Sequence, residues 1–377
     1  MLLSAGERAS ASAKARVFRG RMLSREDYMR LLECETVGAI ASFLSRTEAY
    51  GRYFDGTPHP EELRRWELEE IITLVPVMEE APFGRYLGRM RSSLLDAWGA
   101  RFDVEVIKRV LRMIVTGLGS REALRRWVGS APLSLADEER LLSAQSLRDV
   151  LESVRGGPLE KVLGDPLRRV EKEARGEALF HAKTAMDSFF LTRILSEARK
   201  LPVPERRWVR RLFGVRVDLI NIYWIYRGRR FFRMSPEEAL AMTLPVRYRL
   251  GFEALTTFAF APDAGSMVAL MRESRYGAAF PEDAPGGDAT AVSLVEMELE
   301  HDLYRFLWSA ASEIFRSGSA GVHVPLAYLT LRELEVKDLF TIIEGVRYHY
   351  DTRRLRGFLI NPGAGAAGRE GGKEWPS

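Results

Sequence analysis

Apolar side chains recur every three or four positions along most of this chain, which is the period of an α-helix with one buried face. The first clear case follows Ser24, where Tyr28 and Leu31 are succeeded by Ile40 and Phe43 at helical spacing. Alternating polar and apolar runs are scarce, as are the Asn-Gly or Asp-Gly turns that join hairpin strands. The pattern therefore predicts an all-α fold.

Capping residues mark several of the expected helix starts. Ser24 precedes Glu26 and Asp27, so its side chain can accept a free backbone N–H while the carboxylates favour the first turn. Residues 235–238 supply an N-cap, a proline at the first helical position and a glutamate at the third, which is a capping box. Thr330 and Glu333 have the same spacing and predict a further helix start.

A self-comparison finds one kind of segment three times, each starting at an acidic residue and continuing into an apolar helix. The segments are FDVEVIKRVLRMIVTG with Asp103, RVDLINIYWIYRG with Asp218 and LRELEVKDLFTIIEG with Glu335. The acidic anchors lie 115 and 117 residues apart (218 − 103 and 335 − 218). This even spacing predicts three diverged helical repeats, although amphipathic helices also resemble one another without common ancestry.

A shorter motif, Tyr-Gly-x-x-Phe, supports the same phase. It occurs at residues 50–54 and 276–280, which are 226 positions apart (276 − 50), close to twice the repeat length. The expected divisions are a flexible N-terminus (1–13), helical repeats at 14–120, 121–234 and 235–360, and a disordered Gly/Ala-rich tail (361–377). Residues 284–288 are rich in Pro, Gly and Asp and predict a surface loop inside the third repeat.

Composition is that of a folded soluble protein, with 46% hydrophobic and 29% charged residues. The net charge of +4 is too small to indicate nucleic acid or an anionic membrane by itself. The charges are unevenly distributed: residues 199–233 hold eleven Lys or Arg against Glu205 and Asp218, whereas residues 282–302 hold seven carboxylates and no Lys or Arg. Such sectors suit docking to charged protein partners.

The single cysteine, Cys34, excludes an intramolecular disulfide and a multi-cysteine metal site and favours a reducing cytoplasm. We expect it to lie in a helix, where Glu33 and Glu35 disfavour a thiolate. Apolar stretches such as residues 251–262 are too short to cross a bilayer, and the start of the chain lacks the long apolar segment of a secretory signal.

Two strings have a catalytic appearance without the context that chemistry requires. GAGAAG at residues 363–368 matches a dinucleotide fingerprint, but only nine residues follow, which leaves no room for the helix and the ribose-binding acid. Glu298 and His301 form one Glu-x-x-His pair, whereas a bundle di-iron site needs two, so a solvent-exposed acidic helix is the simpler interpretation. Phosphate-binding-loop, serine-hydrolase and zincin motifs are also missing from the sequence. We therefore expect no enzyme activity, no cofactor and no metal.

The basic segment around Trp208 predicts one cationic helix face. Two pairs of arginines, Arg206 with Arg207 and Arg210 with Arg211, lie one helical turn apart. This face could hold phosphates of nucleic acid or lipid, contact an acidic protein partner, or be solvated. No recognised nucleic-acid module surrounds it.

Taken together, these segments resemble the C-subunit family of archaeal-type and bacterial V-type ATPases, whose eukaryotic equivalent is the d-subunit of the V-ATPase. The likeness covers residues 14–359 and is carried by SREDYMRLLE, FLSRTEAYGRYF, DVEVIKRVLR, DLINIYWIYRGR and the closing LRELEVKDLFTIIEGVRYH. That last segment resembles the family's acidic, Asn-Ile-containing terminal helix. Asp338 stands where the usual Asn would be, and Val106 where the first repeat commonly has Asn.

The resemblance implies three helical repeats about a pseudo-threefold axis, forming a funnel. It implies a non-catalytic central-stalk rotor protein that seats the rotor shaft on the membrane proteolipid ring and transmits torque between them. The protein would then be peripheral, on the cytoplasmic side of the membrane, with the shaft subunits and the ring as partners and without nucleic acid or a small-molecule substrate.

The two docking faces that the resemblance implies suggest particular residues. A concave shaft side would be lined by repeat-equivalent positions: Arg112 and Arg227 align in the repeat, and Arg347 follows the third helix at a slightly different offset. The ring side would favour basic and aromatic residues near headgroups. The candidates are Arg112, Arg227 and Arg347 for the shaft, and Trp208, Arg210 and Arg211 for the ring, with ordinary solvated side chains as the alternative for each.

Three other classes of protein remain as alternatives. A generic helical scaffold for protein–protein interaction would have shorter repeats, of roughly 30 to 50 residues. An enzyme whose site forms only in three dimensions would show a pocket with convergent titratable residues. A nucleic-acid binder would use the basic sector from Arg206 to Arg233 and bind with strong salt dependence.

Overall fold

A computed structural model of the chain describes residues 5–86, 91–117, 119–130, 133–169, 175–277 and 289–363. Helices dominate these residues and none of them lies in a β-strand, so the all-α prediction is confirmed. The chain forms two compact units, called unit 1 (1–7, 77–206 and 244–246) and unit 2 (8–76, 207–243 and 247–377). Three helices have residues in both units, namely α1 (Ala5–Gly20), α4 (Arg65–Glu80) and α11 (Val203–Arg230).

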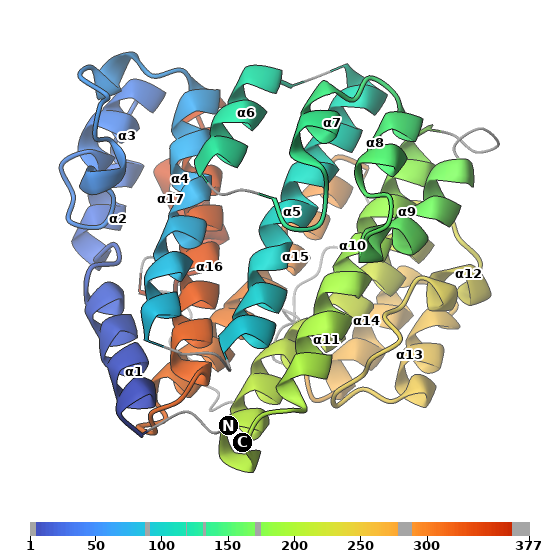
Figure 1. Cartoon of the computed structure of the whole chain (residues 1–377). Helices are drawn as coiled ribbons and strands as arrows, with labels where there is room; N and C mark the ends of the chain where they lie inside the picture. Colours follow the sequence, from blue (N-terminus) through green and yellow to red (C-terminus); the bar gives the residue numbers. More distant parts are fainter. Residues whose placement is uncertain are drawn as a thin grey trace. The chain divides into compact units, whose positions relative to one another are not determined.

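Unit 1 is built on α5 (Arg91–Thr116) and α10 (Arg175–Ala198), which lie side by side (Figure 1). Both helices bury apolar side chains, such as Ile107 of α5 and Ile194 of α10, and this burial supplies the main stabilisation. Lys108 Nζ lies 3.0 Å from Glu105 Oε1 and 2.6 Å from Asp187 Oδ1, so an ion pair also joins the two helices. The remaining helices of unit 1 are α6 (Arg121–Ser130), α7 (Glu138–Ser143), α8 (Leu147–Ser153), α9 (Pro158–Arg169) and the 3-10 helix η3 (Ala81–Arg85).

Unit 2 brings the beginning and the end of the chain together. Its long helices α15 (Ala289–Arg316) and α16 (His323–Arg347) pack against each other, and α2 (Arg25–Leu32), α3 (Val37–Leu44) and α17 (Thr352–Phe358) pack against α16 (Figure 1). One core cluster joins Tyr28 of α2, Ile40 of α3 and Ile342 of α16, all fully buried. The other helices of unit 2 are α12 (Pro236–Ala241), α13 (Phe252–Ala259), α14 (Ala264–Glu273) and the 3-10 helices η1 (Gly51–Tyr53) and η2 (Pro60–Glu62).

Two of the three expected helix starts are confirmed. Ser24 caps α2 in a capping box with Asp27, and Ser235 caps α12 in a box with Glu238. The start expected at Thr330 is wrong, because α16 begins seven residues earlier, at His323, and runs through this position. The Thr330 side chain is buried, and its hydroxyl donates to the Leu326 carbonyl within the same helix.

The expectation that Cys34 lies in a helix is also wrong, since α2 ends at Leu32 and the thiol is half-buried in the following turn. Burial first, and the Glu33 carboxylate second, raise the pKa of this thiol, as expected for a cysteine that is not a nucleophile. Helix α1 begins at Ala5, inside the segment expected to be flexible. The expected loop at 284–288 and the glycine-rich tail beyond residue 363 lie outside the described residues.

Candidate functional site

Three long helices each bury one aspartate whose carboxylate accepts backbone N–H groups from a later segment. In α5, Asp103 accepts from Ser134 N at 2.7 Å and Leu135 N at 2.6 Å. In α11, Asp218 accepts from Tyr248 N, Arg249 N and Leu250 N at 3.0, 2.7 and 3.1 Å. In α16, Asp338 accepts from Ile360 N at 2.6 Å and Asn361 N at 3.0 Å. Each aspartate thus fixes a chain segment 22 to 32 residues further on.

Two of these aspartates also accept a tyrosine hydroxyl. Tyr276 Oη donates to Asp218 at 2.8 Å, and Tyr28 Oη donates to Asp338 at 3.1 Å. Burial raises the pKa of all three aspartates against the opposing effect of these hydrogen bonds. For Asp338 the pKa rises to about 7, because the side chain is fully buried and the Glu335 carboxylate lies nearby.

These contacts show that Asp338, and not the predicted anchor Glu335, matches Asp103 and Asp218 in its bonds to later backbone N–H groups. The separations become 115 and 120 residues (218 − 103 and 338 − 218). Glu335 instead accepts from Leu23 N at 2.9 Å and Tyr50 Oη at 3.0 Å and forms an ion pair with Arg332. The sequence offered two acidic residues in one turn, and only the long-range contacts distinguish them.

With Asp338 as the anchor, the three helices share further positions. The residue four places after each aspartate is a fully buried isoleucine, namely Ile107, Ile222 and Ile342. The residue nine places after each aspartate is an arginine, namely Arg112, Arg227 and Arg347. The offset expected for Arg347 therefore disappears, and all three predicted shaft-binding arginines occupy the same register.

The Tyr-Gly-x-x-Phe motif has a physical role in both of its copies. Tyr50 and Tyr276 each donate to a buried carboxylate, Glu335 and Asp218 respectively. A Cβ atom on the glycine of the second copy, Gly277, would lie 1.9 Å from the Arg272 carbonyl oxygen, and one on Gly51 would lie 2.8 Å from the Ser45 carbonyl oxygen. Glycine is needed because the turn that directs the tyrosine inward brings two backbone segments too close for a side chain.

The three register arginines differ in their surroundings. Arg112 is exposed on α5. Arg227 is half-buried, with its guanidinium over the rings of Tyr223 and Phe232. Arg347, the last residue of α16, is exposed, lies over the ring of Tyr348 and is 3.6 Å from a Glu344 carboxylate oxygen. An exposed guanidinium, as at Arg112 and Arg347, can pair with a partner's carboxylate.

The three residues expected on the ring side serve different purposes. Arg210 is exposed. Arg211 makes a bidentate ion pair with Glu313 of α15, at 2.7 and 2.5 Å, which ties α11 to α15 within unit 2. The Trp208 ring stacks on the ring of His323, with centroids 6.1 Å apart and planes 24° from parallel. Arg211 and Trp208 therefore have internal partners, whereas the Arg210 side chain faces solvent.

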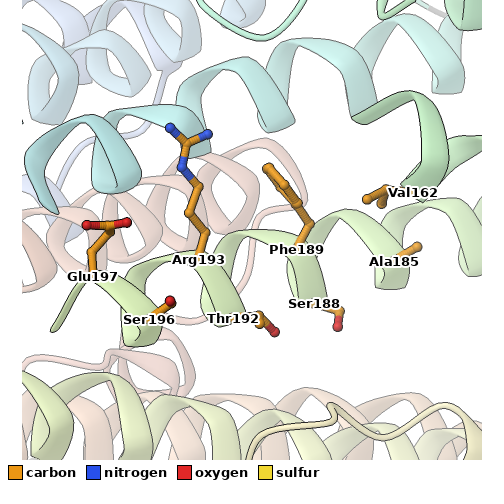
Figure 2. A pocket seen from close by; sticks show the side chains of 8 residues that line it. All are labelled: Val162, Ala185, Ser188, Phe189, Thr192, Arg193, Ser196 and Glu197. Atoms are coloured by element: carbon orange, nitrogen blue, oxygen red, sulfur yellow. The ribbon is translucent and has the colours of Figure 1, made fainter. Parts of the chain in front are cut away.

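Unit 1 contains a groove along α10, with a volume of about 490 Å³ (Figure 2). The lining residues are Val162 from α9 and Ala185, Ser188, Phe189, Thr192, Arg193, Ser196 and Glu197 from α10. Figure 2 shows Phe189 and Arg193 pointing to one side of α10, and Ser188 and Thr192 to the other. The charged lining residues are Arg193 and Glu197, and Glu197 is paired with Lys200 at 2.7 Å. The lining offers no convergent pair of acid and base.

Among the residues that the structure describes, other chemistry-bearing groups do not assemble into a site. The sequence suggested that His301 lies on an exposed helix face, and this is wrong. Its ring packs near Phe358, and burial lowers its pKa to about 4. The Glu298 side chain lies outside the described residues. In the described part of the chain, no three His, Cys, Asp or Glu side chains are arranged to hold a metal ion. Nor does any described helix have the length and apolar character needed to span a bilayer.

Comparison with known proteins gives a consistent result. A family model described as "ATP synthase (C/AC39) subunit" matches residues 11–358. The A-type ATP synthase C-subunit of Methanosphaera stadtmanae is 23% identical over 339 residues, covering 89% of this chain and 83% of that protein. The protein of the same description from Thermococcus onnurineus is 22% identical over 355 residues, covering 92% and 88%. The one from Methanocaldococcus jannaschii is 21% identical over 281 residues, covering 71% and 65%.

Proposed function

This chain belongs to the ATP synthase (C/AC39) subunit family, and from this premise we propose that it is a non-catalytic central-stalk rotor component of an A/V-type ATPase. It seats the rotor shaft on the membrane proteolipid ring and transmits torque between ATP turnover and ion translocation. Its place is peripheral, on the cytoplasmic side of the membrane. The archaeal relatives, described as C-subunits of A-type ATP synthases, support the membership of such a complex.

The observation that carries the proposal is the common register of the three helices, with an aspartate, an isoleucine four residues later and an arginine nine residues later in each. We attribute it to three diverged repeats about a pseudo-threefold axis, which would form a funnel. A coupler must resist bending, because torque is lost in any soft element. Close packing of buried apolar side chains supplies stiffness, and the three aspartates add it by fixing the segments after their helices.

The shaft side of this proposal uses Arg112, Arg227 and Arg347. All three lie near the C-terminal ends of α5, α11 and α16. A planar guanidinium presents paired N–H donors that match a carboxylate, so acidic side chains of the shaft are the fitting partners. Three equivalent arginines also allow the funnel to hold the shaft from three directions, which would oppose slipping.

On the ring side, Arg210 is the residue that we propose to contact polar loops or lipid headgroups, since its side chain is exposed. Trp208 and Arg211 would support this contact indirectly. The stack on His323 fixes the tryptophan, and the pair with Glu313 fixes the neighbouring turn of α11. A positive charge near the ring is favourable beside anionic headgroups.

Binding of the full chain to isolated shaft subunits and, separately, to the detergent-solubilised proteolipid ring tests the function. We expect both to bind, at one copy of this chain per complex. Binding to neither at native salt would contradict the rotor role and favour a generic helical scaffold. Arg210→Ser should weaken ring binding and leave shaft binding unchanged.

The triple variant Arg112→Ser, Arg227→Ser, Arg347→Ser should lower shaft affinity at least tenfold, because each lost contact with a carboxylate removes a charge-assisted hydrogen bond. The matched control replaces three exposed arginines outside the register, Arg148, Arg155 and Arg316, with the same loss of charge. Equal shaft affinity of the triple variant and the wild type would remove the arginine assignment while leaving the rotor role intact.

A further inference from the structure

The end of α16 and the start of α17 form an exposed surface rich in tyrosine and arginine, which we call the α16–α17 corner (residues 347–354). Tyr348 is 56% and Tyr350 40% exposed, although large aromatic side chains are usually buried. Their ring centroids lie 6.1 Å apart. The Arg347 guanidinium lies 5.0 Å from the Tyr348 centroid, and the Arg354 guanidinium 5.4 Å from that of Tyr350. Two neighbouring exposed tyrosine rings thus each have a guanidinium group within about 5 Å of the ring centre.

The corner stands on a rigid base. Tyr350 N donates to the Gly345 carbonyl at 2.9 Å, which closes the end of α16, and Asp351 caps α17 by accepting from Arg354 N. A Cβ atom on Gly345 would lie 2.1 Å from Leu355 Cδ2, so α17 packs directly against the α16 backbone. Below them, Asp338 holds the segment after α17 through Ile360 N. Side chains presented by such a base need little ordering on binding.

Backbone strain marks the same place. His349 has a φ of 54°, one of two non-glycine residues in the described part of the chain with a left-handed backbone. This conformation is strained for a non-glycine residue and persists where surrounding contacts impose it. It turns the chain sharply between Tyr348 and Tyr350, and so brings both rings to the surface beside each other.

The charge of the corner selects the partner. Arg347, Arg353 and Arg354 are exposed; Arg347 lies 3.6 Å from a Glu344 carboxylate oxygen, and the Asp351 carboxylate is engaged in capping α17. Tyrosine and arginine, together with tryptophan, are enriched among the residues that dominate the binding energy of protein–protein interfaces. Three cations are few for a nucleic acid or a lipid surface, which are bound through larger basic clusters. We propose that the corner is a docking site for an acidic segment of a protein partner, whose carboxylates pair with the arginines and whose backbone covers the tyrosines.

The proposal rests on the proposed function, because the partner would be another component of the rotary complex and Arg347 is one of the register arginines. Two double variants leave Arg347 in place, namely Tyr348→Ser with Tyr350→Ser, and Arg353→Ser with Arg354→Ser. The matched control is Arg247→Ser with Phe252→Ser, which removes another exposed arginine–aromatic contact, 5.1 Å long, in unit 2. Circular dichroism and thermal unfolding verify that each variant is folded.

The experiment measures the affinity of each full-length variant for the rotary complex prepared without this protein, and for vesicles containing phosphatidylserine. We expect each corner variant to bind the complex at least tenfold more weakly than the wild type, with the arginine variant less sensitive to salt, and the control to bind as the wild type does. Corner variants that bind like the wild type would overturn the docking site alone. Corner variants that bind the vesicles more weakly but bind the complex as the wild type does would overturn the docking site in favour of a membrane contact. A wild-type chain that does not bind the complex would overturn the proposed function as well.

Discussion

Helices α11 and α16 each bury an aspartate in the same register. The groups that donate hydrogen bonds to the two carboxylates, however, lie at very different distances along the chain. Asp218 of α11 accepts from backbone groups 30 to 32 residues later and from Tyr276, 58 residues later. Asp338 of α16 accepts from groups 22 and 23 residues later, and from Tyr28, 310 residues earlier. The first aspartate organises one continuous region, and the second joins both ends of the chain.

The neighbouring residues strengthen this contrast. One turn before Asp338, Glu335 receives Leu23 N and Tyr50 Oη, and Arg332 donates to the Ala49 carbonyl. The middle of α16 therefore holds the N-terminal helices through several buried polar contacts, each of which is costly to leave unmade.

The most damaging change should be Asp218→Ala. It leaves three backbone N–H groups and the Tyr276 hydroxyl without their acceptor, so we expect a loss of about 4 kcal/mol in the free energy of unfolding. Urea denaturation measures the loss, and hydrogen exchange should show it first at the amides of residues 248–250. Asp263→Ala, which removes an exposed N-cap of α14, is the control and should cost much less than Asp218→Ala.

A uniform increase in exchange over all of unit 2 after Asp218→Ala would contradict the local role of this aspartate. It would mean that α11 and its following segment open only with the whole unit. The Asp338→Ala variant should give the wider effect instead, with faster exchange in α2 as well as at residues 360 and 361.

The second prediction uses pH. The pKa of Asp338 is raised from 3.8 to about 7 in the folded protein. Between about pH 4 and 7 the folded state therefore keeps a proton that the unfolded state releases, and stability falls as the pH rises, by at most about 1.4 kcal/mol per pH unit. We expect the wild type to lose about 2 kcal/mol more than Asp338→Asn does between pH 5 and pH 7.5, because asparagine does not titrate.

Urea denaturation of both proteins at the two pH values measures this difference. The pKa values of Asp103 and Asp218 are also raised by burial, but these groups titrate in both proteins, so their contributions cancel in the comparison. Equal losses in the two proteins would show that the hydrogen bonds from Ile360, Asn361 and Tyr28 keep Asp338 ionised despite its burial.

The sequence predicted what depends on neighbouring residues. The helical period, the Ser24 and Ser235 caps and the segments around Asp103 and Asp218 are all local patterns, and each corresponds to a helix or cap in the structure. Thr330 had the same local signature as Ser235, but its burial against the rest of unit 2 made it part of a longer helix. Tertiary packing outweighed the capping preference there.

The parts of the candidate site that the sequence missed depend on distant residues. Glu335 and Asp338 are three residues apart, and choosing between them required the segments around residues 50 and 360. An arginine nine places after each aspartate was a usable signal, since it fits Asp338 and not Glu335. The pairing of Arg211 with Glu313, 102 residues away, had no counterpart in any local pattern.

The smallest expected effects come from the two tyrosines, and they distinguish the two helices most directly. Tyr28→Phe and Tyr276→Phe each remove one hydroxyl that donates to a buried carboxylate, and each should cost about 1 kcal/mol of unfolding free energy. The two losses should be similar in size but different in place. Tyr276→Phe should speed hydrogen exchange at residues 248–250, whereas Tyr28→Phe should speed it in α2 and at residues 360 and 361. If both variants speed exchange at the same amides, α11 and α16 open as one cooperative unit. The contrast between Asp218, which acts locally, and Asp338, which joins the two ends of the chain, would then have no energetic basis.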